Sequence, residues 1–126
     1  MIVGIGVDIV DTARIARALE KWGDRFRGRI LHAGEVREYR LSSAAAAYLA
    51  RQFAAKEAVS KALGTGMRAG VHFGDIRVLR GAGGAPFVEL AGGAVERAGK
   101  LGADHIHISI SDEAGYAVAY AIAEKR

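Results

Sequence analysis

The sequence contains no cysteine and a single proline among its 126 residues. The absence of cysteine excludes a disulfide scaffold, a thiolate metal site and a cysteine nucleophile. No stretch rich in proline, glycine and serine divides the chain, and its mass of 13.3 kDa suits one domain rather than two. We therefore expect a single domain over residues 1–126. A chain this short buries a small fraction of its surface and would gain from oligomerisation.

Aromatic residues and long hydrophobic runs are also scarce. Aromatic residues make up 7% of the chain, which is too few for a surface on which successive nucleic-acid bases stack. The first residues, MIVGIGVD, are apolar but have no basic lead and reach an acid at Asp8, which is typical of neither a signal peptide nor a membrane-spanning helix. We therefore expect a cytoplasmic protein without a membrane partner. The sequence also lacks a dinucleotide fingerprint, a Walker loop and a Gly-x-Ser-x-Gly turn.

Apolar and basic residues, in contrast, are plentiful. Hydrophobic residues account for 51% of the chain and charged residues for 25%, which is enough apolar material for a packed core. The net charge is +4, and residues 41–80 hold six Lys and Arg against two Asp and Glu, whereas residues 81–126 hold four against six. This distribution indicates an anionic partner, namely a phosphate compound, a nucleic acid or an acidic protein. A well-solvated surface would give the same composition.

Hydrophobic periodicity predicts an α+β fold. Residues 2–10 form a buried strand with glycines where another backbone can come close, and residues 12–22 form a helix that Gly23 ends. The residues of this helix that recur at helical spacing and should face the core are Ile15, Ala18, Leu19 and Trp22. The later elements are a long alanine-rich helix, a hairpin, a short helix and a final strand pair, over residues 43–63, 75–79 with 86–90, 93–101, and 105–111 with 116–123. Because helices and antiparallel strands are mixed without βαβ alternation, we expect a small antiparallel sheet packed with a long helix and shorter helices.

Charged residues that interrupt apolar segments are candidates for chemistry. Asp8 lies inside an apolar strand, where an ionised carboxylate needs a partner, water or a metal, or else caps a neighbouring turn at the strand's end. Glu57 lies in the alanine-rich helix with Ser60 and Lys61 three and four residues later, so that the three side chains can project together. If Asp8 and Glu57 converge, their oxygens suit Mg²⁺, and Lys61 with the backbone amides of residues 64–66 would bind a phosphate. An exposed Glu57–Lys61 pair is the alternative.

Two further patterns each allow a functional and an ordinary interpretation. His105 and His107 face one way on a strand; without a third ligand a zinc site is a weak hypothesis. His107 is either a hydrogen-bond donor to a nucleotide or phosphate, or an ordinary half-buried histidine. Basic residues of the first helix and of the segment after it form either a solvated face or a ridge for an acidic helix or a nucleic-acid backbone. These basic residues are Arg14, Arg17, Lys21, Arg25, Arg27 and Arg29.

Three segments of the chain together resemble one enzyme family. Residues 4–11, GIGVDIVD, resemble the first motif of the small 4′-phosphopantetheinyl transferases, the holo-acyl-carrier-protein synthases. Residues 53–66, FAAKEAVSKALGTG, are similar to the second motif of the family, and residues 107–113, HISISDE, are similar to the third. The motifs occur in order along essentially the whole chain, and the second is the most specific. The resemblance implies the 4′-phosphopantetheinyl transferase-like fold and a homotrimer with active sites between subunits.

The resemblance also implies a reaction and a set of site residues. Such enzymes transfer the 4′-phosphopantetheine of coenzyme A to a serine of apo-acyl carrier protein, here expected to serve fatty acid biosynthesis, and release adenosine 3′,5′-bisphosphate. By the family pattern Asp8 and Glu57 bind Mg²⁺ and Lys61 contacts a phosphate of coenzyme A, which makes these three the expected catalytic residues. The residues expected to line the nucleotide site are Lys61, Gly64, Gly66, His107 and Ser109. The residues expected to dock the acidic carrier, rather than a nucleic acid, are Arg14, Arg17, Lys21, Arg25 and Phe26.

The chain departs from the family pattern at two places. Gln52 stands before Phe53, where many relatives have an arginine, and Arg51 lies one residue further back. Asp112 and Glu113 stand where some relatives have His-Asp, so a histidine base is absent there. Two other functions explain parts of the chain: a small basic nucleic-acid-binding module, and a metal-dependent phosphohydrolase that uses the same two carboxylates.

Overall fold

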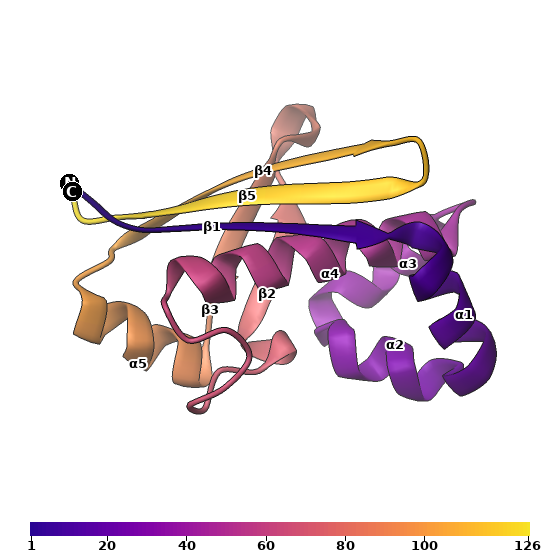
Figure 1. Cartoon of the computed structure of the whole chain (residues 1–126), viewed down its shortest axis with the longest axis horizontal. Helices are drawn as coiled ribbons and strands as arrows, with labels where there is room; N and C mark the ends of the chain where they lie inside the picture. The colour runs from indigo at the N-terminus through magenta and orange to yellow at the C-terminus, as the bar shows by residue number, and fades with distance from the viewer.

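The computed structural model describes all 126 residues and arranges them around one long helix, α4. A three-stranded sheet lies over α4, while α1, α2 and α3 pack near one of its ends and α5 near the other, as Figure 1 shows. The α-helices are α1 (Thr12–Trp22), α2 (Asp24–Ile30), α3 (Val36–Leu41), α4 (Ala45–Ala62) and α5 (Gly92–Leu101). The strands are β1 (Ile2–Asp11), β2 (Ile76–Arg80), β3 (Pro86–Leu90), β4 (His105–Glu113) and β5 (Tyr116–Glu124). These elements confirm the predicted α+β class.

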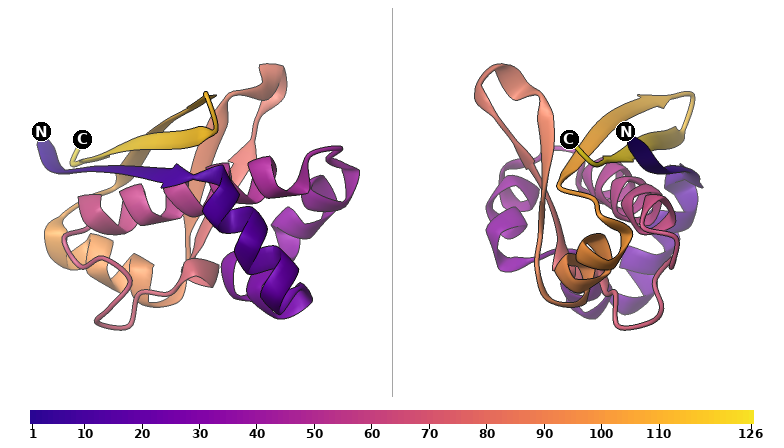
Figure 2. Two further views of the ribbon diagram at one scale, coloured as in Figure 1. Left: turned by 45° about the vertical axis from the view of Figure 1, so that its right-hand side comes forward. Right: turned by 90° about the vertical axis from the view of Figure 1, so that its left-hand side faces the viewer.

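The two ends of the chain and the hairpin complete the arrangement. Met1 and Lys125 exchange hydrogen bonds of 2.7 and 2.8 Å, which places the termini side by side (Figure 2). Strands β2 and β3 form a separate antiparallel hairpin that extends away from the three-stranded sheet (Figure 2, right). None of the helices combines the length and the hydropathy needed to cross a bilayer.

The face of the three-stranded sheet toward α4 is built from small side chains. The strand order is β1-β5-β4, antiparallel throughout, and β5 turns four buried alanines toward the helix, Ala117, Ala119, Ala121 and Ala123. On β1, a Cβ added to Gly6 would overlap the backbone carbonyl of Ala58, and one added to Gly4 would overlap that of Ala62. The close approach predicted at the two glycines is confirmed. Small residues on both sides let α4 lie directly on the sheet.

The opposite face of this sheet, which we call the outer face, is uncovered in the single chain. Its apolar side chains are Ile5, Val7 and Ile9 of β1 with their register partners Ile122, Tyr120 and Val118 of β5. Ile9 is 64% exposed and Val7 52% exposed. The prediction of a buried strand over residues 2–10 is therefore wrong for this face, because the helices cover only one side of the sheet.

Helix α1 begins and ends as predicted, but of its four expected core residues only Ile15 is fully buried. Leu19 is partly buried against the core, and Ala18 lines a surface hollow. The Asp11 side chain accepts a hydrogen bond from the Ala13 amide at 2.9 Å, and Gly23, with φ of 56°, ends the helix. Ile15 is buried against α4, whereas Trp22 is 53% exposed. The prediction that Trp22 faces the core is wrong because Trp22 is the last residue of α1, where the chain turns into α2, and its indole lines a hollow between the two helices.

A buried polar stripe fixes the rotation of α4 about its axis. Gln52, Lys56 and Ser60 are spaced four residues apart and are at most 1% exposed. Lys56 Nζ donates to Glu35 Oε1 at 2.7 Å, and both side chains are 0% exposed. Gln52 Nε2 donates to the same Glu35 carboxylate and to the Val78 carbonyl at 2.9 Å. The network ties α4 to the turn before α3 and to β2.

Candidate active site

The three residues predicted to be catalytic lie together between β1 and α4. Asp8 is on the face of β1 toward α4, and its side chain is 16% exposed. Lys61 Nζ donates to Asp8 Oδ1 at 3.1 Å and to the Val7 carbonyl at 3.0 Å. Glu57, one helical turn before Lys61, is half-buried and close enough to both for their charges to act on its carboxyl. The alternative that Asp8 caps a turn is wrong, because its partner is a lysine on α4.

The charges of Asp8 and Lys61 both act on the carboxyl of Glu57. Burial and, after it, the negative charge of Asp8 raise the pKa of Glu57 above its ordinary value, while the positive charges of Lys61 and Arg14 oppose the rise. Two neighbouring carboxylates that repel each other would be stabilised by a cation between them. We call the surroundings of Asp8, Glu57 and Lys61 the cleft.

The donor atoms of this cleft fit a hard divalent cation. Carboxylate oxygens are the ligands that Mg²⁺ prefers, and Asp8 and Glu57 supply one group each. No cluster of three or more His, Cys, Asp and Glu side chains is arranged to hold a metal ion anywhere in the chain. The remaining ligands of an ion in this cleft would therefore be water and phosphate oxygens, which is the usual coordination of Mg²⁺ on a phosphate substrate.

The turn after α4 carries the predicted glycines, but its backbone amides are already occupied. Gly64 and Gly66 have φ of 83° and 62°, as helix-ending residues require. The Gly64 amide donates to the Lys61 carbonyl at 2.9 Å, and the amides of Thr65 and Gly66 donate to the Ser60 carbonyl at 3.2 and 3.1 Å. The amides expected to approach a phosphate instead cap the helix. The two glycines lie just beyond the end of the helix that carries Lys61.

Ser60 does not project beside Glu57 and Lys61, contrary to the prediction from its spacing. It is 0% exposed, and its hydroxyl donates to the Glu57 carbonyl at 2.7 Å. Its position on the buried stripe of α4 turns it away from the cleft. Ser60 is therefore a structural residue of the helix.

His107 and Ser109 lie on the outer face, on the other side of the sheet from Asp8. His107 pairs in register with Ile122, and Ser109 with Tyr120. The His107 Nε2 atom is 3.0 Å from Glu124 Oε1, and this hydrogen bond lowers the pKa of the Glu124 carboxyl. Within one chain the structure does not bring these two residues to the cleft. Their contact with the nucleotide stays a prediction.

At each departure from the family motifs, one residue has a partner within the chain. Gln52 is buried in the network with Glu35, so its side chain cannot reach a ligand. Arg51, the next residue toward the N-terminus, forms an ion pair with Asp112 at 3.0 Å. Asp112 is the first residue of the second departure, so the pair joins the start of α4 to the end of β4.

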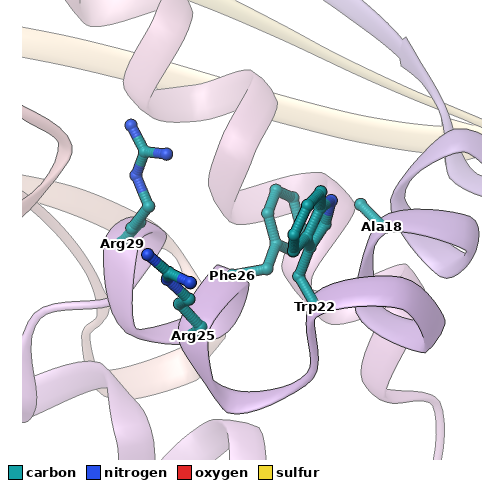
Figure 3. A pocket seen from close by; sticks show the side chains of 5 residues that line it. All are labelled: Ala18, Trp22, Arg25, Phe26 and Arg29. Carbon is teal, nitrogen blue, oxygen red and sulfur yellow. The ribbon is translucent and has the colours of Figure 1, made fainter.

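The predicted basic ridge borders a hollow with an aromatic lining. The hollow, of about 440 Å³, lies between α1 and α2 and is lined by Ala18, Trp22, Arg25, Phe26 and Arg29. Figure 3 shows the Trp22 and Phe26 rings together, with the Arg25 and Arg29 guanidinium groups beyond Phe26. Arg17 and Lys21 are exposed on α1. The helical spacing of Trp22 predicted a core residue, but a position at a helix end next to a glycine is also typical of a surface residue.

One ridge residue links this surface to the cleft. The Arg14 guanidinium lies 5.8 Å from the centre of the Phe53 ring, at the start of the second motif, and its charge acts on Glu57. A partner that docks on α1 would therefore lie next to the cleft.

Comparisons with known proteins agree on one family. Residues 4–121 match the 4′-phosphopantetheinyl transferase superfamily. A holo-[acyl-carrier-protein] synthase from Halorhodospira halophila (strain DSM 244 / SL1) is 51% identical over 122 residues, which cover 97% of each chain. The crystal structure of holo-[acyl-carrier-protein] synthase from Neisseria meningitidis has a TM-score of 0.91 and 40% identity, covering 99% of this chain and 100% of that one.

A solved relative also contains a ligand. The holo-(acyl-carrier-protein) synthase from Bacillus anthracis str. Ames, in complex with CoA (3′,5′-ADP), has a TM-score of 0.83 and 36% identity, covering 100% of this chain and 99% of that one. The family match, the sequence identity over nearly the full length and the similarity of fold all indicate the same family. The chain belongs to the holo-[acyl-carrier-protein] synthases, enzymes of the 4′-phosphopantetheinyl transferase superfamily.

Proposed function

We propose that Asp8, Glu57 and Lys61 form the centre at which this chain transfers the 4′-phosphopantetheine group of coenzyme A to a serine of an apo-acyl carrier protein. The observation that carries the proposal is the convergence of the three side chains, with Lys61 Nζ 3.1 Å from Asp8 Oδ1, beside a basic surface suited to an acidic protein. The Bacillus anthracis relative in complex with CoA (3′,5′-ADP) supports the choice of coenzyme A as donor.

The reaction is a displacement at the phosphorus that carries the pantetheine arm. The serine oxygen forms a bond to this phosphorus, and the bond from phosphorus to adenosine 3′,5′-bisphosphate breaks. Asp8 and Glu57 would hold Mg²⁺, which, when bound, supplies Lewis-acid stabilisation of the pyrophosphate charge. Glu57 is our candidate to accept the serine proton, because a raised pKa brings a carboxylate closer to the range of an effective base.

Lys61 changes its partner in this proposal. In the free chain its ammonium group neutralises Asp8. Its side chain is 49% exposed, so it can turn from Asp8 to a phosphate oxygen of coenzyme A. There it would disperse the charge that develops on the leaving nucleotide.

The carrier docks, in our proposal, on the ridge formed by Arg14, Arg17, Lys21, Arg25 and Phe26. The basic side chains complement an acidic helix and favour association. The hollow beside Phe26 can receive an apolar side chain of that helix, which a nucleic-acid backbone would not supply. Since Arg14 borders the cleft, a carrier helix on this ridge would present its serine near Glu57.

We further propose that the chain forms a homotrimer through the outer face. The apolar rows of β1 and β5 form an exposed patch of a kind that marks protein contacts. His107 and Ser109 lie on this face and can join a nucleotide site only across an interface. Light scattering is expected to give a mass of three times the chain's 13.3 kDa. A mass of one chain at assay concentration would contradict the proposal.

The test of the reaction is intact-mass spectrometry of an apo-acyl carrier protein incubated with coenzyme A, Mg²⁺ and this protein. We expect the carrier to gain the mass of one phosphopantetheine arm, and EDTA to prevent the gain. The fatty-acid carrier is our expected substrate, with a polyketide carrier as the comparison. Free phosphopantetheine without a modified carrier would indicate a phosphohydrolase. Salt-sensitive, Mg²⁺-independent binding to nucleic acid without transfer would indicate a nucleic-acid-binding module.

Docking on the ridge is tested by Arg25→Glu. Arg25 lines the hollow and has no ion-pair partner in the structure, so reversing its charge removes attraction without breaking an internal contact. We expect the KM for the carrier to rise by about tenfold, the effect of roughly 1.4 kcal/mol, with the KM for coenzyme A unchanged. Arg37→Glu, an exposed site on α3, is the matched control. Equal KM values for the carrier in both variants would remove Arg25 from the docking surface.

A further inference from the structure

Arg97 of α5 reaches the end of α4, a contact that no motif of the sequence indicates. Its Nε donates to the Leu63 carbonyl at 2.7 Å, although Arg97 and Leu63 are 34 residues apart in sequence. Leu63 caps the C-terminal end of α4, where carbonyls lack helical partners and a positive charge is favourable. The guanidinium group is thus held in place by the helix that carries Glu57 and Lys61.

The glycine turn leaves room for this guanidinium group. A Cβ added to Gly64 would come within 3.1 Å of Arg97 Nη2, which is tighter than ordinary van der Waals contact. Gly64 therefore serves two needs, the positive φ of 83° that ends the helix and the space that Arg97 occupies.

The outer nitrogens of Arg97 have no partner in the chain. Arg97 forms no ion pair, and its Nη1 and Nη2 atoms donate no hydrogen bond. Neither atom is buried, so both are accessible to solvent. The amides of residues 64–66 are occupied in capping α4, whereas Arg97 is fixed beside this turn and still offers donors. A guanidinium fork with two free nitrogens matches the geometry of phosphate oxygens.

We propose that Arg97 binds a phosphate group of coenzyme A at the end of α4, where the glycine turn was expected to supply backbone amides. The inference rests on the proposed function, because it assigns one more contact to the same donor substrate. Lys61 would then bind coenzyme A from α4, and Arg97 would bind it from α5, beside the C-terminal end of α4. Arg97 would act as a substrate-binding residue and not in the proton transfer.

The test compares Arg97→Gln, Arg97→Lys and the control Lys100→Gln, which removes one exposed charge from the same helix. Calorimetric titration with 3′,5′-ADP and with coenzyme A measures binding at several salt concentrations. We expect Arg97→Gln to weaken binding of at least coenzyme A by about tenfold and to reduce its salt dependence, with Arg97→Lys intermediate. Lys100→Gln should bind like the unmodified chain.

A purely structural role of Arg97 predicts a different result. Loss of a helix cap lowers Tm but leaves the dissociation constant and its salt dependence unchanged in the folded protein. If Arg97→Gln and Lys100→Gln bind coenzyme A equally well while the unmodified chain modifies the carrier, only the assignment of Arg97 fails. If the unmodified chain neither binds coenzyme A nor modifies a carrier, the proposed function fails as well.

Discussion

Replacing Glu57 by glutamine is expected to reduce the rate of phosphopantetheine transfer by roughly 10³-fold, because the change removes the proposed base and one of two carboxylates for the metal. The amide keeps the shape of the side chain, so the cleft should stay intact. The measurement is the initial rate of carrier modification by intact-mass spectrometry. Near-normal turnover would remove Glu57 from both roles. Glu96→Gln, an exposed carboxylate on α5, is the control.

The same substitution is expected to stabilise the metal-free protein at neutral pH. Burial and Asp8 raise the pKa of Glu57 in the folded chain, so the ionised carboxylate is less favourable there than in the unfolded chain. Removing its charge should raise Tm near pH 7. The gain should vanish below the ordinary pKa of a glutamate, where the carboxyl is protonated in both states. A fall in Tm near pH 7 would contradict the claim that the ionised Glu57 carboxylate destabilises the folded chain.

Replacing Lys56 by methionine is expected to lower the free energy of unfolding by about 3–5 kcal/mol, because it leaves the Glu35 carboxylate buried without its cation. Both side chains of the pair are 0% exposed, and the Nζ–Oε1 distance is 2.7 Å. Burial lowers the pKa of Lys56, and the adjacent Glu35 carboxylate opposes that shift. Urea unfolding followed by circular dichroism measures the change.

The double variant Glu35→Gln with Lys56→Met separates the buried charge from the lost packing. Neutralising Glu35 removes the uncompensated charge, so the double variant should be more stable than Lys56→Met alone. Lys100→Met, at an exposed lysine, is expected to change the unfolding free energy by less than about 0.5 kcal/mol. A double variant no more stable than the single one would show that the ion pair does not determine this effect.

Local patterns along the chain predicted the five strands and helices α1, α4 and α5, but not helix α2 (Asp24–Ile30). They also predicted a close backbone approach at β1, though not that α4 makes it. Gly4 and Gly6 indicated a close approach, and the alternation of alanine with larger residues on β5 gave two unlike faces. The limits of α1 followed from Asp11 and Gly23, since capping depends on residues next to the helix end. The second motif, with Glu57 and Lys61 one turn apart, was a strong signal for the cleft.

Which face of each element is covered was decided only by the tertiary structure. The alternation of side chains along a strand predicts that His107 and Asp8 each lie on one face of a sheet. It does not predict that they lie on opposite faces, because that depends on the pairing of distant strands. In α4, apolar residues occur on all sides, so periodicity could not show that Lys56 is buried and Lys61 exposed. The contact of Arg97 with Leu63 is likewise absent from any local pattern.

The sequence by itself thus determined most of the elements, the candidate carboxylates and the family, because these depend on spacing along one segment or on motifs that occur in order. The fold decided that Asp8 pairs with Lys61 on the helix that carries Glu57, while His107 and Ser109 stay on the outer face. The physical reason is that side-chain direction follows from local backbone geometry, whereas burial is set by which distant segments pack together.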